Sequence, residues 1–229
     1  MLCRLRRSAL VCGIALGSLV APLAAPAQAA GIIRITEVMS NSTVTNVTGS
    51  IFNGDWFELT NYGDESVTLS GWKMDDNSYN FNLAVALNGI TSLGVGESVV
   101  FIENAVGDKV SDFKTAASDV YKRQMQVGSY GGSGVGLSST GDGVVVYNSG
   151  GTEISRVSFG AATNNRTFYW SYDSTGVLGT ANGGLISVSG SGGAYTTGSG
   201  GANANVGSPG TAITLASIPN LYWTASGSA

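Results

Sequence analysis

The sequence predicts an all-β fold built as a β-sandwich. Short apolar runs alternate with turn residues along most of the chain, which is typical of sandwiches. Glycine accounts for 34 of 229 residues, about twice its usual share of ~7%, and so favours tight turns over helices. The stretch Asp55–Asp76 combines both features, because two alternating runs flank an Asn-Tyr-Gly-Asp turn. We therefore expect one β domain large enough to bury a full core.

The rest of the sandwich is expected to be organised around Asp55–Asp76. Alternation places Phe57 and Leu59 on one face of its first strand. Residues 66–70 would return as the second strand of a hairpin and cover that face. Trp72 follows a glycine, and we expect its large ring to fold under the hairpin.

The other expected strands follow from the same period-two pattern. They lie at Gly31–Met39, Tyr79–Leu83, Ser98–Glu103, Val144–Tyr147, Glu153–Phe159, Leu185–Val188 and Ala194–Thr197. Ser98–Glu103 is apolar on both faces, which predicts a central strand. Asp108–Ala117 has apolar residues at helical spacing and predicts one short helix.

Ser118–Gln124 differs in composition from its surroundings, because it concentrates two basic residues in a chain that otherwise scatters its charges. It resembles the peptide produced when sequencing-adapter DNA is translated. The alternative is a solvated surface loop, and neither interpretation points to a function.

The first 29 residues have the pattern of a signal peptide of bacterial type. A basic start is followed by the apolar run Ala9–Leu23 and by the cleavage pattern Ala27-Gln28-Ala29. The mature protein is therefore expected to begin near Ala30 and to be secreted, periplasmic or extracellular. No later run is long and apolar enough to predict a membrane span.

Composition excludes several kinds of chemistry in the mature protein. The chain has no histidine, and its two cysteines, Cys3 and Cys12, both lie in the predicted signal peptide. Ser-His and Cys-His nucleophile systems and histidine- or thiolate-ligated zinc are thus excluded. Without the arginines of the signal peptide, eight basic residues face 15 acidic ones, a net charge of −7. Such an acidic chain is not expected to bind nucleic acid, and we expect a monomer.

A set of motifs resembles the lamin-tail domain. The motifs are I-x-E-V, D-W-F-E-L-x-N-x-G, V-x-L-S-G-W, G-E-x-V-V-F, L-S-x-x-G-D-x-V-V-V and R-V-S-F-G, spread over Ile32–Gly160. Ser208-Pro209-Gly210 is similar to the closing S-P-G motif of bacterial members. The resemblance implies an immunoglobulin-like β-sandwich that serves as a non-catalytic module in exported bacterial proteins. We assign residues 1–29 to the signal peptide, 30–175 to the sandwich, and 176–229 to a Gly/Ser/Asn-rich tail, either packed partly as extra strands or disordered.

Five acidic residues are candidates for carboxylate chemistry or for a Ca²⁺ site: Glu37, Asp55, Glu58, Asp75 and Asp76. None has the spacing of a calcium-binding loop. We expect Asp55 and Glu58 to bind backbone groups at strand ends, and Asp75-Asp76 to open a solvated turn. Glu58 is the only one in a strongly apolar strand, and no partner for it is evident. The prediction is therefore a protein without catalytic residues or an obligatory cofactor.

Two functions remain open. The first is a structural or interaction module that binds a protein or extracellular-matrix partner. The second is a carbohydrate-binding module, or a Ca²⁺-assisted adhesion domain, that uses exposed rings among Phe168, Trp170 and Tyr172 to stack on a polysaccharide. The alternative for these three rings is burial in the sandwich core.

Overall fold

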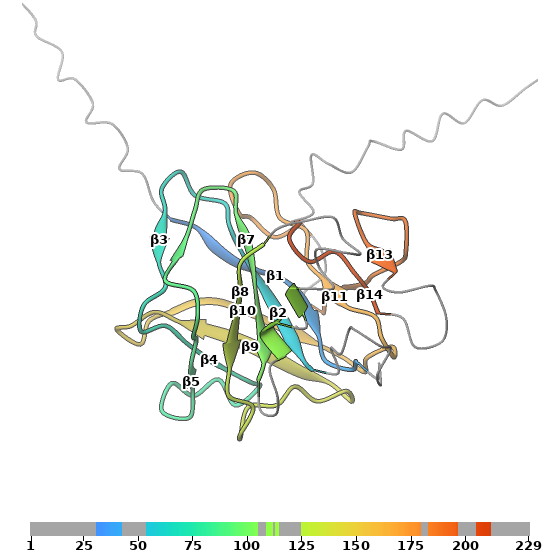
Figure 1. Ribbon diagram of the computed structural model, residues 1–229, viewed down its shortest axis with the longest axis horizontal. Coiled ribbons are helices and arrows are strands. Elements are labelled where there is room, and N and C mark those ends of the chain that lie inside the picture. The colour runs from blue at the N-terminus through green and yellow to red at the C-terminus, as the bar shows by residue number, and fades with distance from the viewer. Residues whose placement is uncertain are drawn as a thin grey trace, which may run out of the picture.

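The computed structural model describes residues 31–42, 54–104, 109–111, 113–114, 125–179, 183–196 and 205–211. The predicted signal peptide and Ser118–Gln124 lie outside these residues. Two β-sheets pack face to face (Figure 1), as predicted for an immunoglobulin-like sandwich.

The larger sheet has six strands. Their order is β12 (Leu185–Ile186), β11 (Phe168–Tyr169), β1 (Ile33–Met39), β2 (Trp56–Asn61), β7 (Ser98–Glu103) and β8 (Val127–Tyr130). All neighbours pair antiparallel except β7 and β8, which are parallel. β2 and β7 are therefore interior strands, which confirms the central place predicted for Ser98–Glu103.

The smaller sheet has four strands, and two short pairs account for the remaining strands of the described residues. The four are β10 (Glu153–Phe159), β9 (Asp142–Tyr147), β4 (Lys73–Asp75) and β5 (Val85–Ala86). The short pairs are β3 (Val67–Thr68) with β6 (Ser92–Leu93), and β13 (Tyr195–Thr196) with β14 (Val206–Gly207). The hairpin of β9 and β10 matches the prediction for residues 144–159.

The main core lies between the two sheets. Phe57 and Leu59 of β2 are completely buried there with Val144 and Val146 of β9. A second, smaller cluster lies on the other face of the six-stranded sheet, which we call the outer face. Its buried members are Met39, Trp56, Val100, Ile102, Phe113 and Val127. Both faces of β2 and β7 are thus covered.

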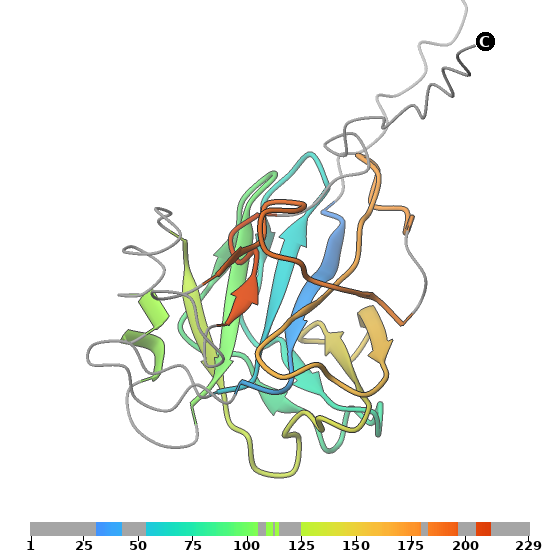
Figure 2. The same cartoon turned by 90° about the vertical axis from the view of Figure 1, so that its right-hand side faces the viewer.

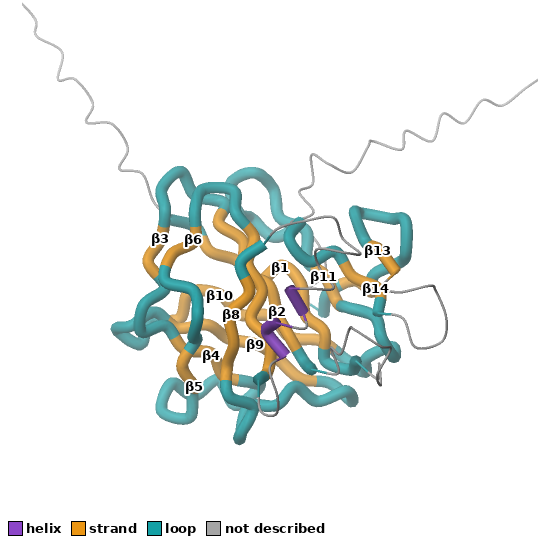
Figure 3. Tube along the Cα trace, viewed as in Figure 1, coloured by secondary structure: helices purple, strands orange, loops and turns teal. Residues whose placement is uncertain are grey.

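Phe113 belongs to the helical pieces at residues 109–111 and 113–114 (Figure 3), which fall within the predicted helix Asp108–Ala117. Its ring meets Trp56 edge-on, with 5.7 Å between ring centroids. The remaining residues of that prediction lie outside the described ones. Within the described residues, no helix has the length and apolarity to cross a bilayer.

The hairpin predicted within Asp55–Asp76 is wrong in its pairing. β2 pairs with β1 and β7, whereas β3 pairs with β6. The physical reason is that β2 is an interior strand whose two edges are already occupied. Residues 66–70 still cover the predicted face, because Leu69 is completely buried in the main core. Trp72 is only 5% exposed and packs in the same core, as predicted.

The strand predicted at Tyr79–Leu83 is also wrong, because this stretch forms turns. Polar side chains hold the turns by bonding nearby backbone N–H groups. Asp76 accepts from the N–H of Ser78 at 2.8 Å, and Asn80 accepts from that of Asn82 at 3.1 Å. Such local bonds compete with strand pairing.

Candidate functional site

A β-bulge in β1 brings polar side chains to the outer face. The register of β1 against β2 shifts between Ile35 and Glu37. As a result, no residue of β2 is paired with Thr36 across the ladder, and Glu37 lies opposite Glu58. Ile35 and Val38 both reach the main core. A bulge inserts one residue and changes the phase of the side chains. Thr36 and Glu37 therefore share the outer side with Glu58.

Glu37 is 1% exposed and bound by two residues from distant parts of the chain. Its Oε1 accepts hydrogen bonds from Thr167 Oγ1 at 2.5 Å and from the backbone N–H of Ser208 at 2.7 Å. Ser208 Oγ donates to Oε2 at 3.1 Å. Burial raises the pKa of Glu37 to about 7, although these hydrogen bonds act in the opposite direction.

Glu58 is completely buried and is bound in a similar way. Its Oε1 accepts from Thr36 Oγ1 at 2.6 Å, and its Oε2 from the backbone N–H of Gly210 at 2.5 Å. The expectation that Glu58 has no partner is thus wrong. The sequence missed the pairing because the bulge and the strand register decide it.

The segment 205–211, which we call the closing segment, covers this carboxylate pair. It contains the Ser208-Pro209-Gly210 motif, whose first and last residues supply the N–H donors to Glu37 and Glu58. Figure 2 shows the orange-to-red C-terminal segments in front of the blue and cyan strands β1 and β2. The motif therefore closes the outer face over two buried acids.

A chain of hydroxyl groups leads from Glu58 towards the surface. Thr36 Oγ1 lies 3.0 Å from Thr60 Oγ1, which in turn lies 2.7 Å from Ser98 Oγ. Thr60 and Ser98 also line a surface pocket of about 440 Å³. The buried carboxylate pair and this pocket are thus parts of one polar network.

The pocket, which we call the hydroxyl pocket, is formed by four separate segments. Its lining residues are Thr60, Asn61, Tyr62, Gly63, Val95, Gly96, Ser98, Ser174, Gly210 and Thr211. None of these ten residues has a side chain with a formal charge. The volume falls within the range of about 300–1,000 Å³ typical of small-molecule sites.

Two hydroxyls of the hydroxyl pocket are buried without a partner. Within the described part of the chain, neither Tyr62 OH nor Thr211 Oγ1 makes a hydrogen bond. Burial, with the nearby negative charge of Glu58, raises the pKa of Tyr62 above its ordinary value. Tyr62 is therefore a neutral phenol at physiological pH and is able to donate a hydrogen bond.

The aromatic site predicted at Phe168, Trp170 and Tyr172 is not present as an exposed surface. The three side chains are 4%, 0% and 4% exposed and belong to the main core. Tyr172 OH donates to the carbonyl of Ile35 at 2.9 Å. These rings cannot stack on a sugar, because the sandwich packs around them.

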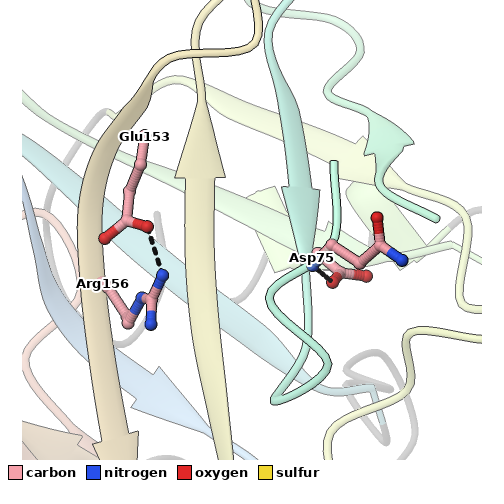
Figure 4. A network of polar contacts seen from close by, with 4 residues as sticks. Asp75, Glu153 and Arg156 are labelled. Atoms are coloured by element: carbon pink, nitrogen blue, oxygen red, sulfur yellow. Dashed lines mark hydrogen bonds and ion pairs between the residues drawn. The ribbon is translucent and has the colours of Figure 1, made fainter. Parts of the chain in front are cut away.

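The turn predicted at Asp75-Asp76 is only partly solvated. Asp75 ends β4 and is completely buried, and its Oδ2 accepts from Ser78 Oγ and from the backbone N–H of Asn80, both at 2.6 Å. Figure 4 shows Asp75 apart from Glu153 and Arg156, which form an exposed ion pair on β10. Asp75 thus stabilises the turn after β4.

Asp55 is the last acidic candidate. Burial, helped by the nearby carboxylate of Glu103, raises the pKa of Asp55 to about 7. Among the described residues, no three acidic side chains are grouped in a way that could hold a metal ion.

Comparison with known families agrees with the motifs. The family model of the Lamin Tail Domain matches residues 26–161. This range contains both strand carboxylates and Tyr62, whereas Thr167, Ser174 and the closing segment lie beyond it. No curated protein matches the chain in sequence.

Proposed function

Because the chain belongs to the lamin tail domain family, we propose that it is an exported, non-catalytic module that binds a protein or extracellular-matrix partner. The family supports a non-catalytic immunoglobulin-like domain. Export and the kind of partner go beyond what the family supports, and export is argued below from the sequence.

The burial and the hydrogen bonds of Glu37 and Glu58 are the main support for the non-catalytic assignment. A general acid or base must reach the atoms of its substrate. Both carboxylates are instead bound by donors of the same domain and are at most 1% exposed. Their position beneath the closing segment fits a structural role. They hold this segment against β1 and β2.

The composition of the chain supports the same assignment. It has no histidine, and its two cysteines lie in the first 12 residues. Nucleophile systems that depend on either residue are therefore not available to the mature domain. The hydroxyl pocket offers neutral groups that can bind, but no group that ordinarily exchanges a proton near neutral pH.

Export is supported by the N-terminal pattern. The basic start, the apolar run Ala9–Leu23 and the Ala27-Gln28-Ala29 pattern are the three parts of a secretory signal.

The test of the non-catalytic assignment is a screen of the purified exported protein against polysaccharides, nucleic acids and phosphoesters. We expect no turnover of any of them. Glu58→Gln and the exposed control Glu65→Gln are assayed in parallel. Turnover that Glu58→Gln abolishes and Glu65→Gln retains would overturn the proposal.

A further inference from the structure

We propose that Met125 is an oxidation site, at which a peroxide converts the thioether to a sulfoxide and thereby loosens the closing segment. The inference goes beyond the proposed function, because it assigns a modification site and its oxidant to a domain that otherwise acts by binding. Met125 is suited to this role by its exposure, by its contact with Gly210 and by its packing on the outer face.

Exposure distinguishes Met125 from the other methionines. The chain has four of them, and Met1 lies in the predicted signal peptide. Met39 and Met74 are completely buried, the first on the outer face and the second in the main core. Met125 is only half-buried. A small oxidant in solution should therefore reach its sulfur first, because susceptibility to oxidation follows exposure.

The reaction is a two-electron oxidation by a peroxide. Met125 Sδ attacks one peroxide oxygen, so that an S–O bond forms while the O–O bond breaks. The sulfur is oxidised and the peroxide is reduced, and the second oxygen leaves with the proton of the first, as water when the peroxide is hydrogen peroxide. Both cysteines, Cys3 and Cys12, lie in the predicted signal peptide. The expected mature protein thus has no thiol that competes for the oxidant.

Met125 lies directly against the closing segment. A Cβ placed on Gly210 would lie 2.9 Å from Met125 Cε and 3.4 Å from its Sδ. The backbone N–H of Gly210 donates to Glu58 Oε2 at 2.5 Å. The sulfur therefore touches the same residue that anchors the closing segment to the buried carboxylate pair.

Met125 also packs against the apolar cluster of the outer face, whose buried members include Met39 and Val127. Methionine suits such a place, because its unbranched and polarizable side chain fills irregular gaps. Met125 thus fills the space between this cluster and the closing segment.

A sulfoxide does not suit this position. Oxidation converts an apolar side chain into a polar one, and a polar group that is buried without a partner costs free energy. Because the side chain is flexible and half-buried, we expect the sulfoxide to turn towards solvent. The closing segment then loses the packing beneath Gly210. The hydrogen bonds that Ser208 and Gly210 donate to the carboxylate pair should open more often as a result.

Limited treatment of the purified exported protein with hydrogen peroxide tests the site. Peptide mapping by mass spectrometry locates the added oxygen, and we expect it at Met125 before Met39 and Met74. Amide hydrogen exchange of residues 205–211 should then rise about 5-fold. The thermal midpoint should fall by about 2–4 °C, the shift that one small lost contribution produces in a domain of this size. Methionine sulfoxide reductase should restore both values.

Met125→Leu is the matched control, because leucine has a similar volume and no sulfur. Before treatment, this variant should resemble the original protein in its thermal midpoint and in the hydrogen exchange of the closing segment. Peroxide should then change neither value.

Three results would overturn the inference. The first is oxidation of Met39 or Met74 as fast as that of Met125. The second is a sulfoxide at Met125 that leaves the hydrogen exchange of residues 205–211 unchanged. The third is an equal response to peroxide in Met125→Leu. The proposed function is tested separately, because partner binding and the absence of turnover are measured on untreated protein.

Discussion

Glu37 and Glu58 are Cα partners across β1 and β2, and each accepts a backbone N–H from the closing segment. The donors, Ser208 and Gly210, lie more than 150 positions further along the sequence. Two buried acids thus join the start of the domain to a motif near its end. Stability should consequently respond both to pH and to changes in the closing segment.

The first prediction is a loss of stability as pH rises from about 4.5 to about 7. The pKa of Glu37 is raised from 4.5 to about 7 in the folded state, so the folded protein binds more protons than the unfolded chain in this window. Stability is then full below pH 4.5 and falls as pH rises through 7. The loss is on the order of 3 kcal/mol, because a tenfold change in proton affinity is worth about 1.4 kcal/mol.

Urea denaturation at several pH values measures this effect. Glu37→Gln should flatten the profile, and the exposed Glu65→Gln should not. Asp55, whose pKa is also raised to about 7, adds a slope of the same sign, and Asp55→Asn isolates it. An unchanged slope in Glu37→Gln would show that Glu37 does not titrate in this window.

The second prediction concerns Gly210, whose φ is +81°. A Cβ at this position would lie 2.9 Å from Met125 Cε. Gly210→Ala should destabilise the fold by about 1–3 kcal/mol because a side chain is strained at this φ, whereas the end of the flexible Met125 side chain can move aside at small cost. Gly96→Ala is the matched control, because its φ is +68° and its Cβ would have no neighbour within 4 Å. Similar losses for both variants in urea denaturation are expected, and a much larger loss for Gly210→Ala would mean that Met125 cannot move aside.

The third prediction is that Trp72→Ala costs about 3–5 kcal/mol, the usual effect of truncating a buried large aromatic side chain. Trp72 is 5% exposed in the main core, whereas Leu83 is 58% exposed. Leu83→Ala should change stability by less than about 0.5 kcal/mol. If Trp72→Ala lost less than about 1 kcal/mol in urea denaturation, Trp72 would not be a core residue.

The fourth prediction is that the exported protein begins at or near Ala30. The Ala27-Gln28-Ala29 pattern after an apolar run has the form that signal peptidase recognises. N-terminal sequencing of protein from the periplasm or medium checks it. Material that retains Met1 would contradict the expected cleavage.

Much of the fold could be predicted because its signals are local. Alternation placed β1, β7, β9 and β10 correctly, and the apolar character of both faces of Ser98–Glu103 identified an interior strand. The partner of residues 66–70 could not be predicted, because strand pairing depends on which sheet edges other strands already occupy.

The sequence by itself determined that this chain is an all-β sandwich, that Trp72 lies in its core and that its 229 residues offer no histidine chemistry. Only the tertiary structure decided that Glu37 meets Glu58, that the closing segment binds both, and that Tyr62 and Thr211 share a pocket. The physical reason is the range of the interactions. The alternation of apolar residues lies within single segments, and composition requires no knowledge of which segments are in contact. The carboxylate pair depends on a one-residue bulge, and the pocket depends on contacts between segments that are far apart in the chain.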